Sequence, residues 1–296
     1  MLWIFVTVVA AATQTARNAM QSGLTSTLGT LGATQVRFVY GWPFAVVFLG
    51  LTAAVAGGRV PAPTVSFLAH TGGGALAQIA GTALLLAAMR ARSFSVATAF
   101  NKTEAVQTAL FAVVILGEPL TAALAAAVVI ATVGVMLAAV KPGAQDWDAQ
   151  SLKPALYGIA SGGAFALASV GFRGGILELG AEPYYLRAAT TLVWSLSIQA
   201  LLLGVWMALF ARAALLGSLA VWRRSLLAGF FGAFASQCWF LGFSLTAAAN
   251  VRTLGLIEVI FAQLVATRLL GQRTTLREAL GMALVVVGVA LLLLFT

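Results

Sequence analysis

Charge is scarce in this sequence. Only 8% of the 296 residues are charged, against roughly 25% in soluble domains, and 61% are hydrophobic. A globular core of this size cannot bury so much apolar surface, so we expect the folded chain to be solvated by lipid. A spanning helix takes about 20 apolar residues, which leaves room for about ten helices joined by short turns. A closed β-barrel needs alternating runs of about 10 residues, and the long continuous Ala- and Leu-rich runs exclude it.

Cysteine and histidine are almost absent. Cys238 and His70 are single residues of their kinds, which excludes a disulfide framework and a Cys/His metal cluster. No GxxxxGK[ST] or HExxH motif is present, so ATP-driven transport and zinc protease chemistry have no support. So few reactive groups argue against an enzyme, and we expect no cofactor and no metal.

Basic residues outnumber acidic ones, with a net charge of +9. They stand singly or in pairs at the ends of apolar runs, which is typical of membrane flanks and not of nucleic-acid binding. No Lys or Arg precedes the first apolar run, so that run is expected to be a retained membrane helix and not a cleaved signal peptide. We therefore expect a lipid bilayer and a small molecule as partners, with no nucleic acid.

Turn residues divide the chain into apolar spans. Breaks are predicted at Gly57-Gly58-Arg59, at Glu118-Pro119 and at Lys141-Pro142-Gly143. The strongly polar linker 141–152 separates a half at 1–140 from a half at 153–296, with five spans in each. The predicted spans are 2–20, 32–56, 65–89, 94–116, 121–140, 153–173, 183–209, 225–246, 249–270 and 275–295.

The two halves repeat each other after a shift of 154 residues. The matched positions are Glu104 with Glu258, Leu116-Gly117 with Leu270-Gly271, Thr121 with Thr275, and Val133-Gly134-Val135 with Val287-Gly288-Val289. An odd number of helices per half inverts the second half in the membrane. Inverted repeats of this kind occur in transporters, whose substrate site lies near the midplane between the repeats.

These residues resemble the EamA repeat of the drug/metabolite transporter superfamily. The first copy reads Glu104, Gly117-Glu118, Thr121 and Gly134-Val135; the second reads Glu258, Gly271, Thr275, Gly281 and Gly288-Val289. The resemblance covers essentially the whole chain and implies an all-α fold of ten transmembrane helices in two inverted five-helix repeats. It departs at Ala105 and Val259, where the family usually has proline, and at Gln272, which replaces the second glutamate of the Gly-Glu pair. The missing prolines weaken any inference of kinked helices at these two positions.

The segment 94–116 carries charges inside an apolar helix. Asn101 and Glu104 share one helical face with further polar residues, and Lys102 points elsewhere, so Lys102 and Glu104 are not a simple pair within one helix. An ionised side chain at the bilayer centre costs at least about 2.5–3.5 kcal/mol. Lys102 either extends toward the interface, forms a structural pair, or binds an anionic substrate group. Glu104 and Glu258 form either a proton-coupling or ammonium site, or a buried hydrogen bond between helices.

Other polar or aromatic positions in the spans complete the candidate site. Arg17 is expected to anchor the first helix at the interface. A polar face in several helices favours one shared cavity, although amides in membrane helices often only join helices together. The full set of substrate-binding or coupling candidates is Gln14, Asn18, Gln78, Thr82, Phe100, Asn101, Lys102, Glu104, Gln237, Trp239, Phe243 and Glu258.

The sequence thus predicts a secondary transporter of a bacterial-type inner membrane. Among relatives, it most resembles exporters of amino acids, including the YddG-type aromatic amino-acid exporters. We expect export of aromatic and other neutral amino acids or related metabolites by alternating access, for which a monomer suffices. The alternatives are a multidrug or other metabolite exporter of the same fold, a membrane scaffold and an embedded enzyme. The distribution of basic residues places both termini outside, whereas the resemblance implies both inside.

Overall fold

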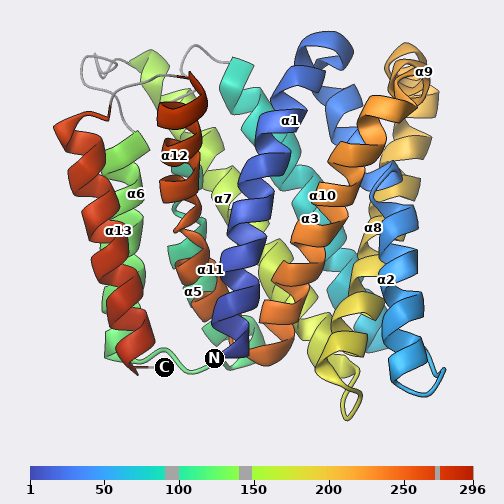
Figure 1. Cartoon of the computed structure of the whole chain (residues 1–296), viewed down its shortest axis with the longest axis horizontal. Coiled ribbons are helices and arrows are strands. Elements are labelled where there is room, and N and C mark those ends of the chain that lie inside the picture. The colour runs from blue at the N-terminus through green and yellow to red at the C-terminus, as the bar shows by residue number, and fades with distance from the viewer. Residues whose placement is uncertain (91–99, 140–148, 271–273, 296) are drawn as a thin grey trace. The chain divides into compact units, whose positions relative to one another are not determined.

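The computed structural model describes residues 1–90, 100–139, 149–270 and 274–295 of the chain (Figure 1). Regular secondary structure in these residues is helical. The break at Lys141-Pro142-Gly143, most of the polar linker 141–152, the start of the predicted span 94–116 and the Gly271-Gln272 pair lie outside the described residues.

The described residues contain seven segments long and apolar enough to cross a membrane. Large apolar side chains cover their outer faces; Val55 is 77% exposed and Leu294 is 78% exposed. Such exposure is stable only in lipid, so the chain is a multi-pass membrane protein. The seven segments are Thr34–Val55, Ala122–Ala139, Ala155–Glu178, Tyr184–Phe210, Ser225–Leu245, Ala248–Arg268 and Leu276–Phe295.

Two compact units make up the chain, and each takes segments from both predicted halves. Unit 1 comprises Met1–Leu76 and Gly171–Thr246, and unit 2 comprises Ala77–Val170 and Ala247–Thr296. The helices α3 (Val65–Arg90) and α7 (Ala149–Glu178) each contribute one end to each unit. The predicted domains 1–140 and 153–296 are drawn from the sequence repeat, and that division stays a prediction.

Unit 1 is built around the long helix α1, which lies along α10 (Figure 1). The helices α2 and α10 both pack against α8, and α9 packs against α1. Besides the ends of α3 and α7, the helices of unit 1 are α1 (Leu2–Val39), α2 (Trp42–Val55), α8 (Tyr184–Phe210), α9 (Arg212–Ala220) and α10 (Trp222–Leu245).

The start of unit 1 agrees with the predicted span 32–56 and differs from the predicted span 2–20, beyond which α1 runs on. Helix α1 consists of two helical stretches that meet at a kink at Gly29, whose φ is 66°, so helical backbone extends into the expected loop on both sides of the kink. Only glycine adopts such a φ readily, which places the kink there. The second predicted span corresponds to the segment Thr34–Val55. It contains a turn at Tyr40-Gly41, where Pro43 in the first turn of α2 lacks an N–H, but both turn residues keep helical backbone angles.

Unit 2 is built around a close pair of helices, α6 and α13 (Figure 1). A second contact joins α5 to α11. Besides the ends of α3 and α7, its helices are α5 (Glu104–Leu116), α6 (Ala122–Ala139), α11 (Ala248–Gly255), α12 (Glu258–Leu270) and α13 (Leu276–Phe295).

The repeated motif residues of unit 2 have structural roles at helix ends and crossings. Thr121 and Thr275 cap α6 and α13, since their Oγ1 atoms accept hydrogen bonds from the amides of Leu124 and Glu278. A Cβ added at Gly134 would lie 2.6 Å from the carbonyl oxygen of Gly281. These glycines therefore let the backbones of α6 and α13 touch, as small residues do in membrane helix pairs.

Candidate functional site: a part-buried charge quartet

Two helices of unit 2 begin with the repeat-related glutamates. Glu104 is the first residue of α5 and follows a turn at Lys102-Thr103; Glu258 is the first residue of α12 and follows a turn at Leu256-Ile257. The predicted span 249–270 corresponds to the membrane-spanning segment Ala248–Arg268, which contains α11, this turn and most of α12. The breaks form although Ala105 and Val259 replace the family's prolines. A carboxylate in a first turn interacts favourably with the helix dipole, which stabilises both glutamates where they stand.

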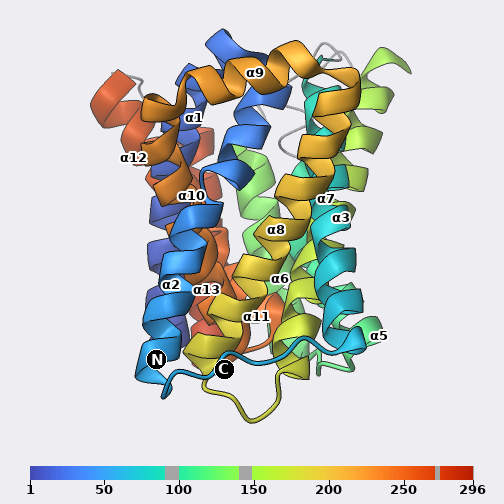
Figure 2. The ribbon, with the colours of Figure 1, turned by 90° about the vertical axis from the view of Figure 1, so that its right-hand side faces the viewer.

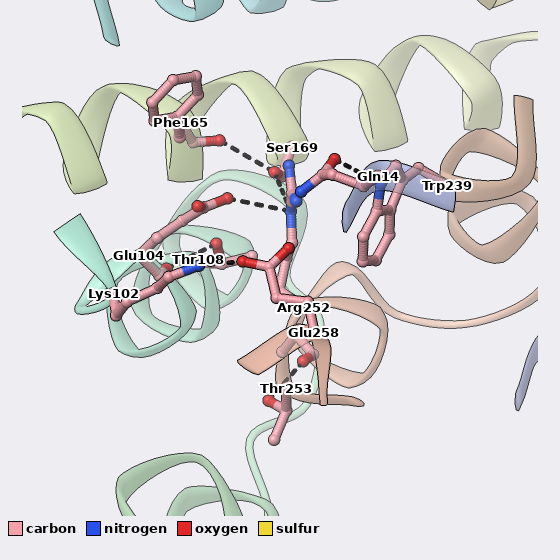
Figure 3. A network of polar contacts seen from close by, with 11 residues as sticks. Gln14, Lys102, Glu104, Thr108, Phe165, Ser169, Trp239, Arg252, Thr253 and Glu258 are labelled. Carbon is pink, nitrogen blue, oxygen red and sulfur yellow. Dashed lines mark hydrogen bonds and ion pairs between the residues drawn. The ribbon is translucent and has the colours of Figure 1, made fainter. Parts of the chain in front are cut away.

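The glutamates pair crosswise with two basic residues. Lys102, which precedes α5, forms an ion pair through Nζ with Oε1 of Glu258. Arg252, on α11, places its Nε 3.1 Å from Oε1 of Glu104. Figure 3 shows the two pairs side by side. We call Lys102, Glu104, Arg252 and Glu258 the charge quartet.

The quartet is neutral and partly shielded from solvent. The side chains of Lys102 and Glu258 are 23% and 16% exposed, and those of Arg252 and Glu104 are 16% and 18% exposed. Each pair joins a residue of the predicted half 1–140 to a residue of the predicted half 153–296. Two cations and two anions therefore compensate one another at a depth where a lone charge would be costly.

Helix α7 supports the quartet from one side. Ser169 accepts a hydrogen bond of 2.7 Å from Nε of Arg252. Asn101 donates through Nδ2 to Oγ of Ser161, which in turn donates to the carbonyl of Gly81 on α3. A Cβ added at Gly162 would lie 2.9 Å from the carbonyl oxygen of Asn101, so only glycine lets α7 approach the turn that carries Lys102.

Glu118 positions the helix that carries Arg252. Gly117 ends α5 in the left-handed conformation, with φ at 64°. The chain then turns, and Oε2 of Glu118 accepts a hydrogen bond of 3.0 Å from the amide of Ala248, the first residue of α11. The Gly-Glu motif thus closes one helix and caps the N-terminus of another.

The predicted site residues divide between the two units. Unit 2 contains Asn101, Lys102, Glu104 and Glu258, and also Phe100, Gln78 and Thr82. The side chain of Thr82 donates to the carbonyl of Gln78 within α3. The carbonyl of Phe100 accepts from the amide and the hydroxyl of Thr103. Lys102 and Glu258 are therefore joined directly, whereas Glu104 pairs with Arg252 and Asn101 bonds Ser161.

Unit 1 contains the remaining candidates. Nε1 of Trp239 donates a hydrogen bond of 3.0 Å to Oε1 of Gln14, which joins α10 to α1. Asn18 is exposed and accepts hydrogen bonds from Arg17 through Oδ1. The prediction that Arg17 anchors a helix end is wrong: the helical stretch that holds Arg17 continues to the kink at Gly29, and Arg17 is only 7% exposed.

Gln237 and Phe243 are both buried in α10. Oε1 of Gln237 has no hydrogen-bond partner among the described residues. The carbonyl of Phe243 accepts a hydrogen bond from Arg173, and its ring lies 6.3 Å from the ring of Phe240. The shared cavity expected from the sequence stays a prediction.

Sequence reasoning missed Arg252 and Ser169 as site residues. From the sequence, the basic residues are treated collectively as membrane flanks, which does not single out Arg252. A signal was available, because a cation six residues before Glu258 inside an apolar span needs a partner. Ser169 carried no signal, since its role depends on which helix packs beside α11.

The comparisons with known proteins agree with this architecture. Residues 153–294 match the EamA-like transporter family. This EamA-like region holds Arg252 and Glu258, whereas Lys102 and Glu104 precede it. No curated protein matches the sequence.

The whole chain has a counterpart among solved structures. One of 28 solved chains that match, described as "Crystal structure of protein", has a TM-score of 0.73 at 16% identity, and the alignment covers 99% of this chain and 95% of that chain. At this identity the likeness shows a shared fold. The EamA-like region therefore belongs to a fold that extends over both halves.

Proposed function

We propose that the protein is a secondary transporter that exports aromatic and other neutral amino acids across a bacterial-type inner membrane. Ten helices in two inverted five-helix repeats would alternate the access of one substrate site, as in the YddG-type exporters that the sequence resembles. The EamA-like region and the multi-pass helical fold support transport as the activity. Neither feature selects the substrate, because one fold serves many functions.

The neutral, crossed charge quartet is the observation that supports an amino acid as the substrate. An amino acid at neutral pH carries one carboxylate and one ammonium. When such a zwitterion replaces one internal ion pair, its carboxylate takes the basic partner and its ammonium takes the glutamate. Every charge is then paired both in the empty quartet and in the quartet with a bound amino acid. A ligand with a single charge would leave one buried group of the quartet uncompensated, at a cost of several kcal/mol.

Lys102 and Glu258 form the pair that the substrate would open. Arg252 is held by both Ser169 and Glu104, and its helix is capped by Glu118. Lys102 instead lies in a two-residue turn, and its ammonium group stands at the end of a flexible four-carbon side chain. The substrate carboxylate would therefore bind the Lys102 ammonium, and the substrate ammonium would bind the Glu258 carboxylate.

Counterflow into proteoliposomes tests the proposal. Vesicles loaded with an unlabelled neutral amino acid should take up the labelled species saturably. The matching N-acetyl amino acid lacks the ammonium and the methyl ester lacks the carboxylate, so neither should compete, whereas the free zwitterion should. Competition by both blocked analogues at the strength of the zwitterion would contradict this assignment of the charges.

Two variants locate the site. Lys102→Met and Glu258→Gln each remove one charge-assisted hydrogen bond, and we expect each to lower the uptake kcat/KM roughly 10-fold or more. Glu182→Gln makes the same chemical change in a loop of unit 1 and should leave uptake unchanged. Efflux of cationic dyes without amino-acid uptake, by folded protein, would instead support the multidrug alternative.

A further inference from the structure

The corner where α9 meets α10 is a feature of unit 1 that the proposed transport does not use. Helix α9 runs across the ends of α8 and α10 (Figure 2). Arg212 begins it, and Arg223 follows it in the first turn of α10; both side chains are exposed. Leu216 is 56% exposed and Trp222 is 48% exposed on the same segment. We call residues 212–223 the α9–α10 corner.

No carboxylate of unit 1 lies near this corner along the chain. The sequence has no Asp or Glu in residues 1–76 or between Glu182 and Glu258. The acidic residues of unit 1 are therefore Glu178 and Glu182, which both precede α8. The 27 residues of α8 separate them from α9, and such a helix is about 40 Å long. Because charges in solution are screened beyond about 8 Å, the positive charge of the corner is not balanced by its own unit.

An open pocket lies at the same place. Its volume is about 440 Å³, and it is lined by Ala220, Val221, Trp222 and Arg223. The guanidinium carbon of Arg223 stands 5.4 Å from the centre of the Trp222 ring, which orients a planar cation by a cation–π contact.

The pocket is held in place from α1. The hydroxyl of Tyr40 donates to the carbonyls of Ser218 and Leu219 at 3.2 and 3.3 Å. These bonds fix the last turn of α9 directly before the residues that line the pocket.

We propose that the α9–α10 corner binds the headgroup phosphate of an anionic phospholipid. Guanidinium groups match the fork of phosphate oxygens, so Arg223, which lines the pocket, would bind the headgroup phosphate, and Arg212 at the other end of α9 would add to the local positive charge. The exposed Trp222 ring and the neighbouring leucines suit the boundary between headgroups and acyl chains. A soluble anion would leave this apolar surface in water, whereas a lipid covers it with its chains.

Lipid binding by the full-length protein in detergent tests this assignment. Native mass spectrometry would compare retention of added phosphatidylglycerol and phosphatidylcholine. We expect a clear preference for phosphatidylglycerol. Because each basic residue near an anionic lipid contributes about 1 kcal/mol, Arg223→Gln and Arg212→Gln should each weaken retention about five-fold.

Arg59→Gln is the matched control, because Arg59 is an exposed arginine of unit 1 in the loop between α2 and α3. It should retain phosphatidylglycerol as the unchanged protein does, and all three variants should melt at similar temperatures. Equal retention of the two lipids, an equal loss in Arg59→Gln, or displacement of the lipid by millimolar inorganic phosphate would each overturn the proposal. The readout is independent of transport, so a failure of the amino-acid assignment leaves it intact.

Discussion

The Arg252–Glu104 ion pair allows the energetics of the quartet to be measured by a double-mutant cycle. The substitution Glu104→Gln removes one charge and leaves the Arg252 cation less than one-fifth exposed. Loss of one partner from a buried pair typically costs 3–5 kcal/mol. Because Ser169 still accepts a hydrogen bond from Arg252, we expect a value near the lower end, about 3 kcal/mol. The double substitution Glu104→Gln with Arg252→Met removes both charges and should lie close to the unchanged protein.

Thermal melting of purified protein in one detergent measures this cycle. A loss of 1 kcal/mol lowers the melting temperature by roughly 2–4 °C in a chain of this size class, so Glu104→Gln should melt roughly 6 °C lower or more. Glu182→Gln serves as the control and should stay within about 1 °C. If Glu104→Gln melts with the control, the pair behaves as an exposed salt bridge. If the double variant loses as much as the two single losses together, the residues are not coupled.

Three further predictions concern the helices that hold the quartet. Gly281→Ala should cost about 1–3 kcal/mol of stability, because the added Cβ would lie 2.6 Å from backbone atoms of α6. Gly50→Ala should instead stabilise the protein by up to about 1 kcal/mol, because nothing lies within 4 Å of the added Cβ. Melting temperatures of the two variants test both expectations. Thr275→Ala should cost about 1 kcal/mol through loss of the α13 cap, while Thr275→Ser should cost less in the same assay. Glu118→Ala should cost about 1 kcal/mol and lower amino-acid uptake by displacing Arg252, and Glu118→Gln should keep much of both because its amide oxygen still accepts from Ala248.

Membrane residence and helical structure could be predicted from composition alone, because apolar surface must be covered by lipid and a backbone in lipid must satisfy its own hydrogen bonds. Several boundaries also followed from local chemistry. Gly57 and Gly58 adopt positive φ where a turn was predicted, and α6, α8 and α13 begin and end within two residues of their predicted spans. These features depend on neighbours in the chain, which the sequence displays directly.

Helix continuity was harder to predict because packing and single backbone angles decide it. The polar stretch after Met20 suggested a loop, yet helical backbone extends into it on both sides of the kink at Gly29. The breaks before Glu104 and Glu258 form without proline. Each leaves a part-buried carboxylate in a first helical turn, where a basic residue from a distant segment can reach it.

The sequence by itself determined that Lys102, Glu104 and Glu258 must find partners or a cavity, because an isolated charge in lipid is too costly. Only the tertiary structure decided which partners they take. Lys102 pairs with Glu258, 156 residues away, and not with its near neighbour Glu104. Arg252 completes the quartet because α11 packs against α5. Spacing along one helix says which way a side chain points; the residue that it meets is set by the packing of helices far apart in the chain.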